Sequence, residues 1–398
     1  MIDVIIPIYK GLAETRRCIE SVLAGRRQQA PFHPVVVDDA SPEPELAQYL
    51  DALAHDARIE LVRNEHNLGF VKSVNRAMAL HADRDVVLLN SDTEVANDWL
   101  DRLRAAAYSN EKVATATPFS NNATICSYPF EGWHGAVPGT LGLAELDRLF
   151  AKTNAALTLF IPTAVGFCMY IRRAALDEVG LFDAERFGRG YGEENDFSMR
   201  AGKAGWRHVL ATDVFVYHEG GVSFSHERFA LIRAAGEVLV AAHPEYHRMV
   251  HDFILADPAR RFRDAIDVAR MKRGHEEGES LLAERSDERA RLLKGLLEIE
   301  KVAAARDSTI GQLNYALEHA GQRLSERDRA IADLTGLAHD RLREITENQQ
   351  ELERLRAGLK HAEELAFARL AELQRIHSSW PWRAFNAVMR RMPRNASS

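Results

Sequence analysis

VVLLNSDTEV, residues 86–95, changes from apolar to polar within a few positions. The run from Val86 to Leu89 is continuous, which is typical of a strand buried on both faces of a sheet. Acidic and small polar residues follow where this strand would leave the sheet. Burial penalises a carboxylate unless something positive compensates its charge. A helix cap made by Ser91 or Asp92 is the simpler interpretation, and a functional site at the mouth of the strand is the other.

Three similar apolar runs precede this strand, and amphipathic stretches separate them. The strand-like runs are DVIIPI (3–8), PVVVDD (34–39) and IELVRN (59–64), and the helix-like stretches are LAETRRCIESVLAG (12–25), PELAQYLDALAHD (44–56) and GFVKSVNRAMALHA (69–82). Strands that alternate with helices predict an α/β fold with a doubly wound, mostly parallel sheet covered on both faces. Each run ends in polar residues, and ligands bind at the carboxyl ends of the strands in such sheets. We therefore expect one polar cleft there.

The composition of the chain favours a large enzyme domain and argues against a nucleic-acid-binding or membrane-spanning protein. The chain has 398 residues and a net charge of −7, so it is long enough for a large catalytic domain plus an extension and shows no global sign of nucleic-acid binding. Its three cysteines lack metal-type spacing, which predicts inert thiols in a reduced, cytoplasmic protein. The N-terminus reads as a strand rather than a signal peptide, and no window reaches the roughly 18 apolar residues of a membrane span.

The character of the chain changes in its C-terminal part. Residues 1–255 are expected to form the catalytic domain, 256–275 a linker, 276–377 a coiled coil and 378–398 a basic, aromatic tail. In the predicted coiled coil, an apolar residue occupies the same position of each seven-residue repeat, and these residues form an apolar column. The position three residues later is mixed and contains Arg and Asn. A long solvated helix or a disordered charged segment is the alternative. The apolar column consists of Ile310, Leu317, Leu324, Ile331, Ala338, Ile345, Leu352, Leu359, Ala366 and Leu373.

The tail combines Trp380, Trp382 and Phe385 with several arginines and no acids. This composition favours a short interfacial helix on a membrane surface, and a frayed basic end is the alternative. A peripheral position on a membrane surface is therefore an added expectation.

Carboxylates and a histidine stand at several strand ends. Asp38 and Asp39 follow a strand, where carboxylates can accept hydrogen bonds from a ribose or a base, or can cap a turn. Asp92 is placed to meet a divalent cation, which prefers oxygen ligands and often bridges substrate phosphates. His218 ends the strand-like run VFVYH (214–218) and can complete such a metal site, although a lone histidine is more often structural.

GYGEENDFSMR, residues 190–200, is the strongest local signal. Acids at the start of a predicted helix are ordinary partners of the helix dipole. However, Glu193 and Glu194 adjoin a glycine turn, where a carboxylate can face a cleft and accept a proton. Both a helix cap and a general base are consistent with this stretch.

Taken together, these motifs resemble the family 2 glycosyltransferases, inverting enzymes with the GT-A fold, of the type that builds bacterial O-antigen and other surface polysaccharides. The nucleotide-binding half is matched, in order, by VIIPIYKG (4–11), VVDDASPE (36–43), NLGFVKSVNRAM (67–78) and LLNSDTEV (88–95). Residues 164–209 resemble the acceptor half, and YHEGGVSF (217–224) resembles the closing loop. The resemblance ends near residue 225 and implies nothing about residues 255–398.

The resemblance assigns roles to particular residues. Asp92 and His218 would bind a divalent metal ion, Mn²⁺ or Mg²⁺, and Asn90 replaces the first acid of the metal motif. Glu194 would be the general base, with Glu193 beside it as the other member of the catalytic pair. The nucleotide-sugar would contact Pro7, Tyr9, Asp38, Asp39, Lys72, Asn75, Asn90 and Ser91.

The implied activity is the transfer of a hexose or deoxyhexose from a nucleoside diphosphate to a hydroxyl of a glycan or lipid-linked acceptor. The family's chemistry inverts the anomeric configuration and uses a metal ion, and the suggested donor is a thymidine- or uridine-diphosphate sugar. We expect a homo-oligomer through the coiled coil and no nucleic-acid partner.

Two other functions share some of these sequence features. A sugar-phosphate nucleotidyltransferase also uses a doubly wound sheet, metal and carboxylates, but PIYKGLAETR (7–16) lacks the glycine-rich basic loop expected after its first strand. A non-enzymatic coiled-coil scaffold with a nucleotide-sugar-binding head is the second rival. The complete set of Asp39, Asp92, Glu194 and His218 argues against that scaffold.

Overall fold

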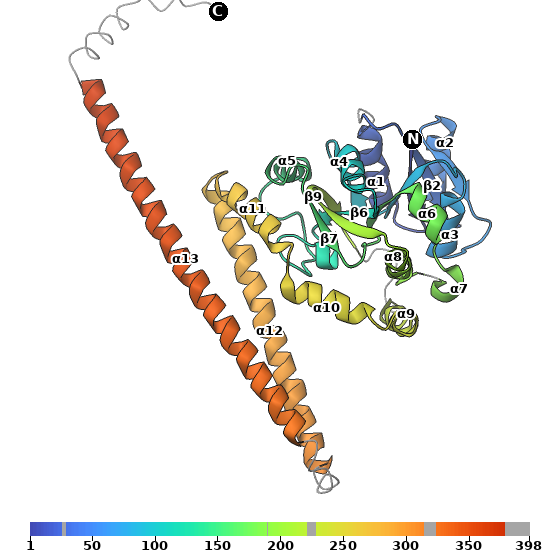
Figure 1. The fold of residues 1–398 in the computed structure, drawn as a ribbon. Helices are drawn as coiled ribbons and strands as arrows, with labels where there is room; N and C mark the ends of the chain where they lie inside the picture. Colours follow the sequence, from blue (N-terminus) through green and yellow to red (C-terminus); the bar gives the residue numbers. More distant parts are fainter. Residues whose placement is uncertain (26–28, 189, 221–227, 314–323, 379–398) are drawn as a thin grey trace, which may run out of the picture. The chain divides into compact units, whose positions relative to one another are not determined.

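The structure is a computed structural model of residues 1–398, and it describes all of them except 26–28, 189, 221–227, 314–323 and 379–398 (Figure 1). The chain divides into two compact units, Met1–Gly295 and Leu296–Ser398. The first unit contains the sheet and the candidate site, and the described residues of the second are helical.

The strands predicted from the N-terminal sequence are present and run parallel to one another. They are β1 (Ile2–Ile8), β2 (Phe32–Asp38), β3 (Glu60–Arg63) and β4 (Asp85–Leu89). The helices between them are α1 (Leu12–Ala24), α2 (Pro44–His55) and α3 (Phe70–Met78). Register pairs such as Ile5 with Val35 and Val4 with Val87 place β1 between β2 and β4.

The sheet continues with strands of mixed direction. β8 (Cys168–Ile171) runs antiparallel between β4 and β6 (Val113–Ser120), and β9 (Arg207–His218) runs parallel to β6. β5 (Thr93–Glu94) and β7 (Thr158–Ile161) both pair antiparallel with β9. The order in this 9-stranded sheet is β3-β2-β1-β4-β8-β6-β9-β5, with β7 on β9. This topology confirms the predicted α/β class.

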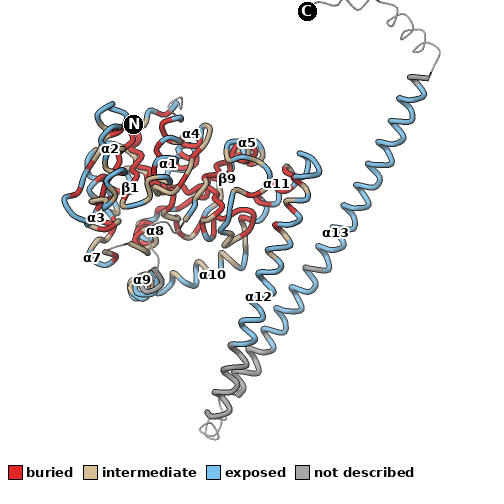
Figure 2. Tube along the Cα trace, turned by 180° about the vertical axis from the view of Figure 1, so that it is seen from behind, coloured by how far each residue is buried: buried red, intermediate tan, exposed pale blue. Residues whose placement is uncertain are grey.

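Successive side chains of the central strands enter two different cores. Val4 and Ile6 of β1 belong to one buried cluster, whereas Ile5 belongs to another on the opposite face. Strand side chains alternate between faces, so a strand covered on both sides is apolar throughout. Burial of each large apolar side chain contributes about 1.5–3 kcal/mol to the stability of the fold. Figure 2 shows the buried strands in red. The first core receives α1, α2, α4 (Trp99–Ala107) and α5 (Leu143–Thr153), and the second receives α3, α6 (Arg173–Val179), α7 (Ala184–Phe187) and α8 (Glu193–Lys203).

The helix-cap interpretation of Ser91 and Asp92 is wrong. The two residues after Asp92 form β5, and the next helix, α4, begins only at Trp99. The Asp92 carboxylate therefore lies between two strands, where the start of a helix cannot compensate its charge.

The segment expected to be a linker, residues 256–275, belongs to the first unit instead. α9 (Arg228–Ala242) and α10 (Tyr246–Ala256) lead into α11 (Arg260–Met271), whose Phe262 and Ile266 are buried in the first core. α12 (His275–Leu313) follows, and the first unit ends only at Gly295. This segment looks like a linker because it is rich in charged residues. Its few apolar residues are nevertheless spaced so that they lie on one face of a helix and pack into the core.

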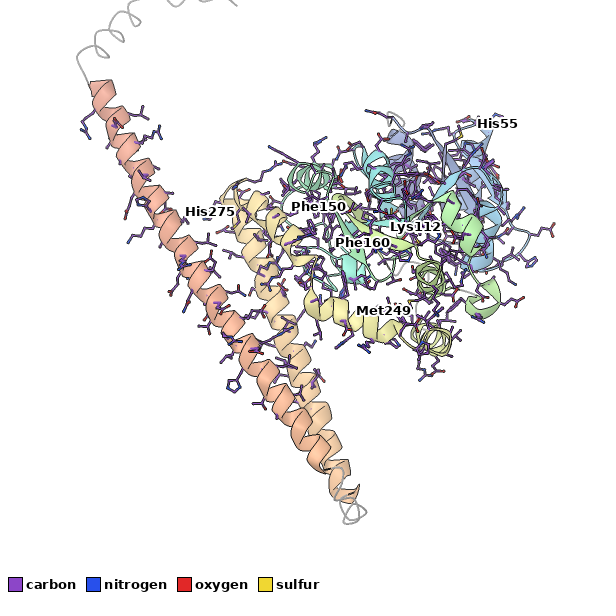
Figure 3. All side chains as sticks on the ribbon, viewed as in Figure 1. His55, Lys112, Phe150, Phe160, Met249 and His275 are labelled. Atoms are coloured by element: carbon purple, nitrogen blue, oxygen red, sulfur yellow. The ribbon has the colours of Figure 1, made fainter. Side chains whose placement is uncertain are left out.

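α13 (Leu324–Ser378) is one helix of 55 residues in the second unit. Leu352, Leu359 and Leu373 of the heptad column are 49%, 63% and 51% exposed, and side chains project from the part of the helix on which they are drawn (Figure 3). Other heptad side chains, including that of Ile310, and the predicted tail lie outside the described residues. Helical structure is thus confirmed here, and pairing between chains stays a prediction. None of the helices in the described ranges is long and apolar enough to cross a membrane.

We expect a chain that ends after Gly295 to be a folded monomer, whereas the full-length chain is a dimer or trimer. The first unit keeps its core in the shortened chain, and the exposed leucines of α13 would become buried when helices of several chains pair. Multi-angle light scattering of both chains tests this expectation. A monomeric full-length chain would rule out pairing between chains and leave α13 as a solvated helix or part of an intramolecular hairpin.

Candidate active site

The polar ends of the first three strands meet, as the sequence predicts. Ile8, Asp38 and Arg63 are neighbours across β1, β2 and β3. The Asp38 carboxylate is buried and accepts hydrogen bonds from Arg63 Nε at 2.8 Å and from the Ser41 amide at 2.8 Å. In these contacts Asp38 caps a turn and forms an ion pair at the cleft edge.

Asp39 organises the loop that leads into α3. Its Oδ1 accepts hydrogen bonds from Asn64 Nδ2 at 2.8 Å and from the Leu68 amide at 2.7 Å. Its Oδ2 accepts one from the Gly69 amide at 2.9 Å, and Gly69 has a φ of +83°, which favours glycine. The carboxylate therefore shapes the cleft wall, and any contact with a base or ribose would add to these bonds.

The other predicted donor contacts differ in their surroundings. Pro7 and Tyr9, at the end of β1, are half-buried, and Lys72 is exposed on α3. Asn75 Nδ2 donates to the Phe182 carbonyl at 2.8 Å, and Asn75 Oδ1 accepts a bond from the Phe182 amide at 3.1 Å. Both ends of the Asn75 amide thus connect α3 to the segment around Phe182.

Asp92 and His218 are brought together by the pairing of β5 with β9. Thr93 is the register partner of His218, and Asp92 Oδ1 lies 3.4 Å from His218 Nε2. Asp92 Oδ2 also accepts a hydrogen bond from the Gly220 amide at 3.1 Å. Burial alone would raise the pKa of Asp92, but the hydrogen bond and charge of His218 hold that pKa below its ordinary value. Asp92 is therefore a carboxylate at neutral pH.

The His218 ring is oriented by its neighbours. Nδ1 donates to the Asn122 carbonyl at 2.7 Å, and the ring stacks on Phe167 with centroids 5.1 Å apart. Because a carbonyl can only accept, Nδ1 carries a proton. Nε2 can then donate to Asp92 when the ring is charged, and it presents a lone pair when the ring is neutral, as in a metal-binding histidine. Among the described residues, no group of three or more His, Cys, Asp or Glu side chains could hold a metal ion. A metal bound by Asp92 and His218 would therefore take further ligands from phosphate or water.

Glu193 and Glu194 form the first turn of α8. Oε2 of each is shielded from water and has no hydrogen-bond partner within the described part of the chain. Burial, followed by the charge of Glu194, raises the pKa of Glu193 well above its ordinary value, and burial also raises the pKa of Glu194. Both carboxyls therefore favour the protonated form more than exposed glutamates do, and two negative charges side by side in this pair are disfavoured.

The carboxylate of Asp196, the next acid of this stretch, is hydrogen-bonded to two neighbouring side chains. This buried carboxylate accepts hydrogen bonds from Arg200 Nε at 2.7 Å and from His243 Nε2 at 2.9 Å. These partners occupy both of its oxygens, so Asp196 is a poor candidate for a general base.

Residues 3–180 match the family model described as Glycosyl transferase family 2. The chain carries a family 2 glycosyltransferase domain. The match and the sheet order confirm the predicted GT-A class of fold. The matched range includes Asp39 and Asp92 and ends before Glu194 and His218. No curated protein matches the sequence.

Solved glycosyltransferase structures resemble the chain at low identity. GalNAc-T7 with UDP, GalNAc and Mn²⁺ is 18% identical over 67% of this chain and 55% of that chain, with a TM-score of 0.43, so this chain spans about half of GalNAc-T7. The mannosyltransferase PcManGT from Pyrobaculum calidifontis, in complex with GDP-Man and Mn²⁺, is 16% identical over 72% and 79%, with a TM-score of 0.43. S. aureus TarS 1–349 is 19% identical over 64% and 69%, with a TM-score of 0.39.

The site of this glycosyltransferase domain also uses residues that the sequence analysis did not single out. Asn121 is buried beside His218: its Oδ1 accepts a hydrogen bond from the His218 amide at 2.8 Å, and its Nδ2 donates to the His218 carbonyl at 2.9 Å. Gly220 has a φ of +74°, and a Cβ there would lie 2.0 Å from Asn122 Nδ2. SNNAT (120–124) has no periodicity, so two adjacent asparagines after a strand were the only available signal.

The main chain of Asn90 fixes the bend between β4 and β5. Its carbonyl accepts hydrogen bonds from the Thr93 hydroxyl at 2.7 Å and from Cys18 Sγ at 3.4 Å. Ser91 is half-buried at the same bend.

The cysteines are inert, as predicted. All of them are free and buried. Burial raises the pKa of Cys18 and of Cys126 to about 12, and it also raises the pKa of Cys168. These thiols stay protonated at neutral pH and take no part in the chemistry of the domain.

Proposed function

We propose that this protein transfers a sugar from a nucleoside diphosphate donor to a hydroxyl of a glycan or lipid-linked acceptor, with inversion at the anomeric carbon. The observation that carries the proposal is the Asp92–His218 pair, which the fold assembles beyond the end of β4 in a family 2 domain. Ligands bind at such strand ends in open α/β sheets.

Mn²⁺ or Mg²⁺ fits the donor atoms of this pair. Asp92 offers a carboxylate, and His218 offers an imidazole nitrogen whose tautomer is set by the Asn122 carbonyl. Mn²⁺ accepts this mixed ligand set more readily than Mg²⁺. A metal ion held here with the diphosphate would serve as a Lewis acid that offsets the negative charge of the leaving group.

Glu194 would act as the general base of a single displacement. Its carboxylate takes the proton of the acceptor hydroxyl, whose oxygen forms a bond to the anomeric carbon while the bond from that carbon to the diphosphate oxygen breaks. Attack from the side opposite the diphosphate inverts the configuration. Burial and the charge of Glu194 raise the pKa of Glu193, which disfavours a second negative charge beside the ionised base.

We further propose a role in surface-polysaccharide synthesis on the cytoplasmic face of the inner membrane, with a uridine- or thymidine-diphosphate sugar as donor. The support is the family 2 domain and the composition of the tail, which lies outside the described residues. Its Trp380 and Phe385 would enter the headgroup region while its arginines meet anionic lipid. A homo-oligomer through α13 would present several tails together and strengthen that binding.

A screen of sugar nucleotides with and without Mn²⁺ or Mg²⁺ tests the proposed activity. We expect a uridine- or thymidine-diphosphate sugar to raise the Tm only when the ion is present, because the ion would hold the diphosphate. A bound ligand at 100 times its Kd stabilises the folded state by about 2.7 kcal/mol. Thermal unfolding of the full-length chain is the measurement. No stabilisation by any uridine, thymidine or guanosine donor would contradict the proposal and favour a non-enzymatic scaffold. Synthesis of a sugar nucleotide from a sugar phosphate would instead favour a nucleotidyltransferase.

A further inference from the structure

A buried cluster of charges joins α11 to the start of α12. Arg270 is fully buried, and its guanidinium donates to Glu284 from Nη1 at 2.7 Å and from Nη2 at 2.6 Å, and to Glu277 from Nε. On the same helix, Asp267 accepts a hydrogen bond from Arg285 Nε at 3.1 Å. All of these residues belong to the first unit.

The same side chains bind the segment between β6 and α5. Arg270 Nη1 donates to the Tyr128 hydroxyl at 2.9 Å, and this hydroxyl donates to Asp267 Oδ1 at 2.8 Å. Glu277 Oε2 accepts hydrogen bonds from the Thr140 amide at 2.8 Å and from the Thr140 hydroxyl at 2.7 Å. The charged cluster therefore holds this segment at both Tyr128 and Thr140.

This segment also makes hydrogen bonds with both the main chain and the ring of His218. Asn121 binds the His218 main chain, and the Asn122 carbonyl accepts a hydrogen bond from Nδ1 of the His218 ring. The Tyr128 amide donates to the Ser120 carbonyl at 2.8 Å, next to these asparagines. Hydrogen bonds and the short main chain between them thus connect α11 to the His218 ring.

Stability alone does not account for such a cluster. Buried ion pairs often contribute less than apolar side chains of similar volume, because each charge loses its hydration. A bidentate guanidinium–carboxylate pair does fix the relative geometry of its partners. A buried network bonded to a loop is therefore suited to specify the position of that loop.

We propose that Arg270 is a positioning residue for His218. With its carboxylate partners it fixes residues 120–140. This segment keeps His218 Nδ1–H donating to the Asn122 carbonyl and turns Nε2 toward the candidate metal position. Only the role of His218 as a metal ligand rests on the proposed function, because the orientation of the ring is independent of it.

Nitrogen-15 NMR of the full-length, histidine-labelled protein tests this proposal without a donor sugar. The His218 signals, assigned by their loss in His218→Asn, should show a single Nδ1-protonated tautomer at a pH where the ring is neutral. We expect Arg270→Met to give mixed tautomers and to raise by about tenfold the Mn²⁺ concentration that broadens these signals, as for groups that orient a metal ligand. Arg260→Met is the matched control and should change neither readout, because Arg260 is an exposed arginine of the same helix that pairs with Asp264.

Gly139→Ala is a second variant, which decides the question if Arg270→Met does not fold. Gly139 has a φ of +84°, and an added Cβ would lie 2.2 Å from Glu277 Oε1 and 2.6 Å from Arg270 Nη2, so it pushes the segment away while every charge stays in place. A single, unchanged His218 tautomer in either folded variant would overturn the proposal. Failure of Mn²⁺ to broaden the His218 signals of the parent protein would count against the proposed function, whereas the tautomer result would still decide this inference.

Discussion

Glu194→Gln is expected to lower kcat for sugar transfer by about 10²- to 10⁴-fold while leaving donor affinity unchanged. Glutamine keeps the size of the side chain and an oxygen for the 3.1 Å hydrogen bond that Asn195 Nδ2 donates to Glu194 Oε1. It cannot take a proton from the acceptor hydroxyl. Steady-state transfer assays, combined with calorimetric titration of the donor, separate these effects.

Glu193→Gln is the matched control for this variant. Since the pKa of Glu193 is raised well above its ordinary value, by burial first and then by the charge of Glu194, glutamine resembles the protonated form that the folded protein favours. We therefore expect a much smaller loss of kcat. Near-normal transfer by Glu194→Gln together with a severe loss in Glu193→Gln would assign the base to Glu193 instead.

The pH profile of the parent enzyme follows from the same pair. Burial raises the pKa of Glu194 above its ordinary value of 4.5, and a general base works only when ionised. Transfer should be present above the raised pKa and should be lost as the pH falls through it. An acidic limb of kcat/KM at or below pH 4.5 would contradict the assignment of the base.

Asp92→Ala is expected to abolish metal-dependent donor binding and to lower transfer by about 10²-fold or more, because it removes the carboxylate of the proposed metal pair. The variant should stay folded, since Asp92 lies at the mouth of a strand, where its carboxylate contacts His218 and the Gly220 amide. Calorimetric titration of the donor with and without Mn²⁺ measures the effect. His218→Ala should weaken the same binding by removing the second ligand.

Asp98→Ala is the control for Asp92→Ala. Asp98 is an exposed carboxylate close by in the sequence, and it pairs with Arg102 rather than with His218. Its removal should leave the Mn²⁺-dependent part of donor binding intact. Unchanged Mn²⁺-dependent binding in Asp92→Ala would show that the metal site lies elsewhere or that the donor binds without a metal ion.

The sequence by itself determined the strands and the position of the cleft. The run from Val86 to Leu89 is apolar at each position because alternate side chains enter the two cores. Neighbouring residues in the sequence are enough to reveal this pattern. A polar residue that directly follows such a run must lie at the edge of the sheet. The local pattern alone therefore places Asp39 and Asp92 at the carboxyl ends of their strands.

Only the tertiary structure decided which side chains meet. Asp92 reaches His218 because β5 pairs with β9, and the register of strands far apart in sequence depends on long-range packing rather than on local periodicity. In the same way, Asn75 is bonded to Phe182, and Arg270 belongs to the interior of the first unit. A polar or charged side chain looks solvent-exposed in a sequence, and it becomes an interior group only when partners from other elements satisfy its hydrogen bonds.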